Sequence, residues 1–263
     1  MSKNNTNGKK EEKYEGILMK LMKLPFRIYK KNKQRTIEKE INEKRESLKA
    51  EYISFKIIRE DKGSLQKWEE DLFNSDSKIG IVLGARGSGK SAFGLKLLEN
   101  IYAKKCRKCC AIGFLENEMP SWIEVVENVP QIRNDSIVLI DEGGVLFNSR
   151  KSMTSANTIL GELMLIARHK NISILFISQN SSNLDINILR QADYLVLKPS
   201  SLLQKDFERK KIREIYDSRE KDFEKYREEE GLSYIYSDKF QGFITNQLPS
   251  FWNTKLSKSF SEK

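Results

Sequence analysis

Residues 79–91 read Ile79-Gly-Ile-Val-Leu-Gly-Ala-Arg-Gly-Ser-Gly-Lys-Ser91, an apolar run that ends in the pattern G-x-x-x-x-G-K-S. Helix-forming residues follow from Ala92 onward. Glycine admits backbone angles that other residues avoid, so successive N–H groups of such a loop can converge on phosphate oxygens. The following helix adds its positive N-terminal end. The stretch therefore predicts a strand, a P-loop that binds a nucleoside triphosphate, and a helix.

The P-loop pattern also predicts two side-chain roles. Lys90 is placed to reach the β- and γ-phosphates, and the Ser91 hydroxyl is placed to bind Mg²⁺. We therefore expect ATP and Mg²⁺ as the cofactors. The residues expected to contact the nucleotide are Gly84, Ala85, Arg86, Gly87, Ser88, Gly89, Lys90 and Ser91.

A second apolar run, residues 137–140, follows Ser136 and ends in Asp141-Glu142-Gly-Gly. This pattern is typical of a buried parallel strand whose carboxylates emerge at the carboxyl edge of the sheet, beside the P-loop. It reads as a Walker B strand. We expect Asp141 to hold Mg²⁺, through water, against Ser91. Glu142 would orient and deprotonate the attacking water.

A third strand, predicted at residues 172–177, is followed by Ser178-Gln179-Asn180. A neutral amide at this strand end can hydrogen-bond both the γ-phosphate and the catalytic water, so Gln179 is the candidate sensor. The alternative is an amide that only caps a loop.

The net charge of +10 is concentrated at the N-terminus, because residues 1–35 carry 11 basic and 3 acidic side chains. Such an arm suits a polyanion, either nucleic acid or an anionic membrane, although a solubilising tail is the alternative. Residues 1–13 should be disordered, and residues 16–30 combine a helical apolar stripe with basic flanks. That stripe would dock on a membrane or partner, or pack on the chain's own core.

The cysteine pattern and the hydropathy predict a cytoplasmic protein. Three cysteines, with no signal peptide, fit a reducing compartment, and no apolar run approaches the roughly 18 residues of a membrane span. The cysteines lie together between residues 106 and 110, far in sequence from His169. We expect Cys109 and Cys110 to begin a buried strand as small apolar residues, and favour this over a zinc site, which would lack its fourth ligand.

The remaining segments predict the organisation of the chain. We expect a charged helix from Thr36 to Asp61, a short helix from Ser121 to Val126, and a helix at 155–169. Further expectations are a strand at 194–197, a charged helix across 202–230, a β-hairpin at 233–245 and an aromatic tail at 248–252 anchored to the core or to another subunit. The predicted divisions are an N-terminal extension (1–63), an ATPase core (64–200) and a C-terminal segment (201–263).

The motifs Gly84–Ser91, Ile137–Glu142 and Ile174–Gln179, with Arg168-His169 before the last, resemble the FtsK/HerA superfamily of P-loop ATPases. Within it, they look most like the genome-packaging ATPases of viruses and mobile elements. The resemblance covers roughly residues 76–200. It implies an α/β fold of the additional-strand class, with a mostly parallel sheet in which the Gln179 strand lies between the P-loop and Walker B strands.

The resemblance also implies a homo-oligomeric ring, usually a hexamer, that moves double-stranded DNA. In such rings an arginine from the neighbouring subunit completes each site, and Arg168 matches the family's arginine before the sensor strand. Arg150 and Arg190 are the reserves, and a local ion pair is the alternative for Arg168. A pore loop is expected near residues 147–155.

Two other functions stay open at this point. The first is a membrane-associated secretion or virion-assembly ATPase, similar to zonula-occludens-toxin-like proteins, docked on a membrane or capsid partner through residues 16–31. The second is a nucleotide-binding switch that hydrolyses too slowly for mechanical work. Glu142 argues against the switch, because a switch has less need of a dedicated base.

Overall fold

The computed structural model describes residues 32–148, 156–253 and 256. The chain divides into two units, residues 1–47 and residues 48–263. In the first unit, residues 32–47 form a helix. The predictions for residues 1–13 and 16–31 lie outside the described residues, and so do residues 149–155 of the pore loop expected near residues 147–155.

The second unit is built on a nine-stranded sheet of order β1-β9-β8-β7-β2-β6-β5-β3-β4. The strands from β7 to β4 run parallel, and β8, β9 and β1 add an antiparallel extension. This confirms the predicted α/β class. The strands are β1 Lys56–Gly63, β2 Ile79–Leu83, β3 Lys108–Ile112, β4 Ile123–Val125, β5 Ser136–Asp141, β6 Ser173–Ile177, β7 Tyr194–Leu197, β8 Ser233–Ser237 and β9 Phe240–Thr245.

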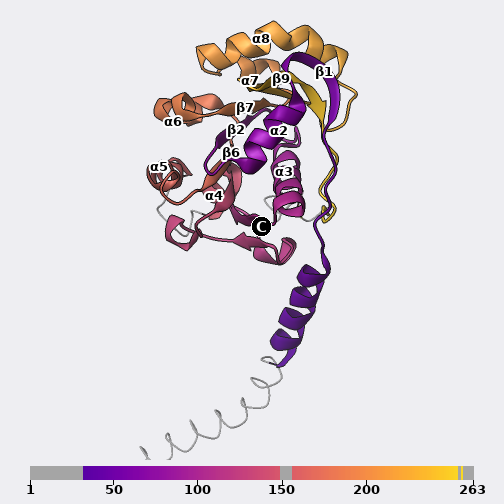
Figure 1. Ribbon diagram of the computed structural model, residues 1–263, viewed down its shortest axis with the longest axis vertical. Coiled ribbons are helices and arrows are strands. Elements are labelled where there is room, and N and C mark those ends of the chain that lie inside the picture. The colour runs from indigo at the N-terminus through magenta and orange to yellow at the C-terminus, as the bar shows by residue number, and fades with distance from the viewer. Residues whose placement is uncertain (1–31, 149–155, 254–255, 257–263) are drawn as a thin grey trace, which may run out of the picture. The chain divides into compact units, whose positions relative to one another are not determined.

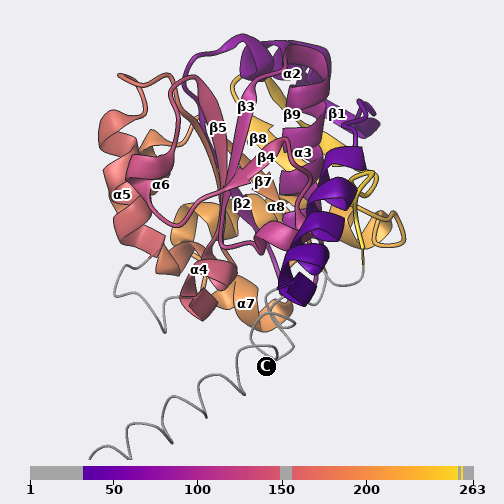
Figure 2. The ribbon, with the colours of Figure 1, turned by 90° about the horizontal axis from the view of Figure 1, so that it is seen from below.

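Helices cover both faces of the sheet, with α2 and α3 on one side and α5 and α6 on the other (Figures 1 and 2). Alternate residues of each central strand explain the two layers: Val82 packs into the core under α2 and α3, whereas Ile81 and Leu83 pack into the core under α5, α6 and α8. The helices are α2 Leu65–Asn74, α3 Lys90–Lys105, α4 Glu142–Asn148, α5 Ala156–Ile166, α6 Ile186–Gln191, α7 Leu202–Asp206 and α8 Lys210–Lys225.

Strand β6 lies between the P-loop strand β2 and the Walker B strand β5. Ile177 is the common neighbour, paired with Val82 on one side and with Asp141 on the other. This confirms the strand order that the resemblance implies. It also brings the carboxyl ends of three predicted strands to one edge of the sheet.

The helix predicted from Thr36 to Asp61 is wrong beyond residue 47. Residues 48–55 belong to no helix or strand, and β1 pairs antiparallel with β9 at the edge of the sheet. The β-branched Ile57 and Ile58 suit that edge, and the tertiary pairing outweighs the helix propensity of the lysines and glutamates around them. The segment 56–63, which prediction assigned to the N-terminal extension, is therefore part of the sheet.

Two further helix predictions need correction. Residues 121–126 do not form a helix, because Ile123–Val125 is the edge strand β4, paired in parallel with β3. The charged segment 202–230 contains two helices, α7 and α8, separated at residues 207–209. Glu208 in this break is 3% exposed and accepts hydrogen bonds from the backbone and hydroxyl of Ser181, so the interruption serves a tertiary contact.

The tail after the predicted hairpin is anchored to the core, as expected. Phe251 is buried and makes an edge contact with Trp122, whose ring stacks on Tyr102 of α3. The indole N–H of Trp122 donates to the carbonyl of Leu48, 3.1 Å away. The aromatic group thus joins the P-loop helix, the linker after residue 47 and the C-terminal tail.

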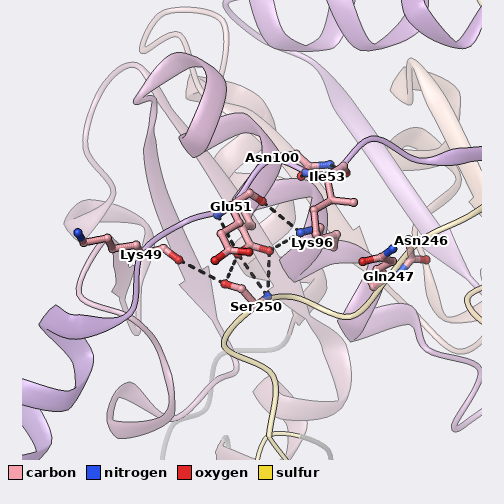
Figure 3. Close-up of polar contacts among 9 residues, drawn as sticks. Lys49, Glu51, Ile53, Lys96, Asn100, Asn246, Gln247 and Ser250 are labelled. Atoms are coloured by element: carbon pink, nitrogen blue, oxygen red, sulfur yellow. Dashed lines mark hydrogen bonds and ion pairs between the residues drawn. The ribbon is translucent and has the colours of Figure 1, made fainter.

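A buried ion pair on α3 binds the same two segments (Figure 3). Lys96 and Glu99 are both fully buried, and their charged atoms lie 2.8 Å apart. The Glu99 carboxylate also accepts from the backbone N–H groups of Glu51 and Ser250 and from the Ser250 hydroxyl. Asn100 exchanges two hydrogen bonds with the backbone of Ile53.

Candidate nucleotide site at three strand ends

The P-loop follows β2 and leads directly into α3 at Lys90. Gly84, Gly87 and Gly89 have φ angles of 150°, 79° and 83°, values that favour glycine. A Cβ atom at Gly84 would lie 2.6 Å from the Cβ of Lys198, so the loop backbone could not approach β7 with a larger residue there. The predicted strand, loop and helix are confirmed, and the backbone has the conformation that a phosphate cradle needs.

Lys90 lies over its own loop. Its Nζ donates to the carbonyls of Gly84 and Ala85, each at 2.8 Å, and the residue is 8% exposed. Burial lowers the pKa of Lys90, and the nearby carboxylates of Asp141 and Glu142 partly oppose that shift. A cation held among carbonyl groups at the mouth of the loop is placed to exchange them for phosphate oxygens.

Ser91 and Asp141 form the candidate magnesium pair. The Ser91 hydroxyl donates to Asp141 Oδ2 at 2.6 Å, and the backbone N–H of Gly143 donates to the other carboxylate oxygen at 3.1 Å. Burial raises the pKa of Asp141, while the bond from Ser91, the glycine amides and the charge of Lys90 oppose the rise.

These residues fit a magnesium ion bound with a triphosphate. One hydroxyl and one carboxylate, side by side, are the hard oxygen ligands that Mg²⁺ prefers when phosphates and water complete its shell. The Ser88 hydroxyl is a buried polar atom without a hydrogen-bond partner among the described residues. It lies in the loop itself, where an incoming phosphate would supply an acceptor.

Glu142 is oriented by a residue that the sequence analysis did not single out. Ser178 is 1% exposed, and its hydroxyl donates to Glu142 Oε2 at 2.5 Å. The strand register explains the contact, because Asp141 pairs with Ile177 and the next residue of each strand follows. The sequence signal for this contact was a serine directly before the candidate sensor Gln179. Recognising the contact also required the order of the strands in the sheet.

Gln179 follows β6 at the same edge, but its side chain is exposed. Its backbone carbonyl accepts a hydrogen bond from the Gln204 side-chain amide in the middle of α7. Its sensor role stays a prediction. Arg86 also projects from an exposed position in the P-loop.

Arg168 lies at the opposite edge of the sheet from the P-loop. It precedes β6, whose five residues span about 17 Å at the usual rise per residue. Arg168 and Arg190 are exposed and line a hollow of about 630 Å³, together with Ile79 and Tyr194, the first residues of β2 and β7. Neither arginine can therefore reach its own P-loop. Arg150, the other reserve, lies outside the described residues.

The cysteines are free, with Cys109 and Cys110 buried in β3 and Cys106 exposed. Burial raises the pKa of both strand thiols. Across the described ranges, no group of three or more histidine, cysteine or acidic side chains could hold a metal ion. Within those ranges, no helix is both long enough and apolar enough to cross a bilayer.

Residues 94–198 match the family model described as Zonular occludens toxin (Zot). The match begins inside α3, after the P-loop, and contains the Walker B strand and β6. None of the curated proteins matches the chain.

Solved structures with a similar arrangement include viral and bacterial proteins. The DNA-packaging ATPase B204 from Sulfolobus Turreted Icosahedral Virus is 15% identical, with a TM-score of 0.44 over 66% of this chain and 99% of that one. The genome packaging NTPase B204 from Sulfolobus turreted icosahedral virus 2, in complex with ATP-gammaS, is 14% identical, with a TM-score of 0.42 over 66% and 100%. The N-terminal domain of zonular occludens toxin from Neisseria meningitidis is 16% identical, with a TM-score of 0.33 over 46% and 76%.

Proposed function

We propose that this chain hydrolyses ATP to drive mechanical work. The observation that carries the proposal is the meeting of three strand ends: the P-loop after β2, Asp141-Glu142 at the end of β5 and Ser178 after β6. In this assignment Lys90 binds the phosphates, and Ser91 and Asp141 hold Mg²⁺. The ion, when bound, neutralises charge on the β- and γ-phosphates.

Glu142 is the general base of the proposed reaction. It is one residue beyond the metal acid, and its hydrogen bond from Ser178 leaves the second carboxylate oxygen to accept a proton from water. Gln179 at the neighbouring strand end would position that water and sense the γ-phosphate. A dedicated base favours a motor over a slow nucleotide switch.

The work we propose is translocation or packaging of double-stranded DNA by a ring, of hexameric size in the FtsK/HerA manner. Two observations support it. Arg168 stands at the edge of the sheet away from its own P-loop, so the site that it completes in this proposal is that of another subunit. The basic residues of the N-terminal arm supply the charge that a DNA backbone would attract.

ATP turnover measured with and without duplex DNA, together with particle mass in the presence of ATP, tests this function. We expect DNA to stimulate turnover, and rising salt to weaken DNA binding steeply because phosphate-bound counterions are released. If neither the rate of ATP turnover nor the particle mass responds to DNA, DNA is not the substrate. A complementary test mixes Arg168→Ala with Glu142→Gln chains: partial recovery of turnover would show an arginine that acts between subunits.

The match to the Zot family model over residues 94–198 favours one second function, a membrane-associated secretion or virion-assembly ATPase. Its docking element would be residues 16–31, through a membrane or a capsid partner. Anionic vesicles distinguish the two functions. Vesicle binding that is lost in a chain without residues 1–35, with turnover indifferent to DNA, would favour the second function.

A further inference from the structure

A second lysine lies directly beneath the P-loop. Lys198 follows β7, and its backbone N–H donates to the carbonyl of Leu83 at 2.8 Å, while the next carbonyl accepts from the N–H of Ala85 at 3.0 Å. The Lys198 side chain passes under Gly84. Its Nζ lies 3.9 Å from the position that a Cβ atom would take if Gly89 carried one. The ammonium group is therefore close to the phosphate cradle, on the side away from solvent.

The charge of Lys198 has only neutral hydrogen-bond partners. The residue is fully buried, and its Nζ donates to the carbonyl of Gly231 at 2.8 Å and to Asn246 Oδ1 at 3.0 Å. The ring of Phe93 lies 5.4 Å away. Among the described residues, no carboxylate forms an ion pair with it.

A buried cation without a counter-charge is costly, and the titration of Lys198 reflects that cost. Burial, and then repulsion from Lys90 on α3, lower the pKa of Lys198 to about 7. Tyr216 on α8 also faces this residue, donating its hydroxyl to the Lys198 carbonyl at 3.0 Å. Burial raises the pKa of that phenol far above the ordinary value, so Tyr216 stays neutral.

We propose that Lys198 is a second cation of the nucleotide site, whose missing counter-charge is the polyphosphate itself, so that binding of a nucleotide drives its protonation. The proposal rests on nucleotide binding by the P-loop. It assigns Lys198 an electrostatic role through the loop, distinct from direct contact by Lys90. Lysine is otherwise almost never fully buried unless it is paired with an opposite charge.

The coupling sets an expected pH profile. If a bound triphosphate raises the pKa of Lys198 by one unit, the protonated chain binds about tenfold more tightly than the neutral one. Because the bound form holds more protons, affinity should fall as pH rises through about 7 to 8 and then level off. At pH 7 the complex should take up about 0.4 proton per chain, from the fractions protonated at these two pKa values.

The test measures the affinity of the full chain for a non-hydrolysable ATP analogue with Mg²⁺ between pH 6.5 and 9. Wild type should bind more tightly than Lys198→Met by nearly tenfold at pH 6.5 and equally at pH 9, where Lys198 is neutral. Lys198→Arg should stay tight across the range. Lys108→Met, which removes one exposed charge at the far end of β3, should follow wild type.

The titration of the nucleotide itself cancels in this comparison, because it is common to every variant. A pH-independent offset in Lys198→Met, or identical profiles for all chains, would overturn the proposal. If Lys198→Met does not fold, calorimetry of wild type in two buffers of different ionisation enthalpy replaces it, and no proton uptake at pH 7 would be the contradicting result. Failure of wild type to bind the analogue at any pH would instead refute the proposed function.

Discussion

Replacing Glu99 by alanine should destabilise the second unit by about 4 kcal/mol. Lys96 and Glu99 are both 0% exposed, and the change leaves the buried ammonium with one remaining acceptor, the Glu51 carbonyl at 3.2 Å. Removing one partner of a buried ion pair costs about 3–5 kcal/mol. The N–H groups of Glu51 and Ser250 and the Ser250 hydroxyl lose their acceptor as well. This loss is a large part of the free energy of unfolding of a typical domain, which is roughly 5–15 kcal/mol.

Equilibrium unfolding in urea, monitored by tryptophan fluorescence, measures this free energy. The control Glu70→Ala, on the exposed side of α2, should stay within about 0.5 kcal/mol of wild type. The double variant Lys96→Met/Glu99→Leu should recover the part of the loss that comes from the unpaired charge, since it removes both charges together, while the Glu51 and Ser250 donors stay without their acceptor. A cost below about 1 kcal/mol for Glu99→Ala, or single-variant costs that simply add in the double variant, would refute the reasoning.

Limited proteolysis reports the same contact independently. Glu99 binds the linker that precedes β1 and the tail that follows β9 (Figure 3). Glu99→Ala should therefore increase cleavage in residues 48–55 and near Ser250 under conditions where Glu70→Ala is cut like wild type. Equal protection in the two variants would show that other contacts hold these segments.

Three further predictions concern the candidate base and two glycines. Ser178→Ala should lower kcat about tenfold and leave the affinity for ATP unchanged, because it removes the 2.5 Å hydrogen bond that orients Glu142 and no phosphate contact; an unchanged kcat would contradict the positioning role. Gly144→Ala should lower stability by more than about 2 kcal/mol in thermal unfolding, since its Cβ would lie 1.9 Å from the carbonyl oxygen of Gly113. Gly161→Ala, in α5 with nothing within 4 Å, should instead stabilise by up to about 1 kcal/mol.

The sequence predicted the central strands well because each carries a decisive local pattern. The P-loop requires its glycines and lysine in a fixed order, and residues 136–142 are apolar up to the acids that must emerge at the sheet edge. Both strands were confirmed, and so was the hairpin at 233–245. The position of β6 between them came from the family resemblance, since periodicity does not order parallel strands.

The wrong prediction and the missed contacts occur where tertiary contacts determine the secondary structure or the burial of a residue. Residues 56–63 are rich in charged side chains, yet they pair with β9 because that edge of the sheet was open to a further strand. Lys96 and Glu99, three residues apart on a helix, look like a solvated surface pair, but both are fully buried. Lys198 likewise follows a strand as an ordinary lysine would, and only the fold places it under the P-loop.

The most direct test of the central claim is ATP turnover by Glu142→Gln, measured beside its affinity for ATP. The account predicts turnover reduced at least about 100-fold, because the general base is lost, with ATP bound as tightly as by wild type. Turnover equal to that of wild type would contradict the assignment of Glu142, and with it the view that the ends of β2, β5 and β6 form one catalytic site.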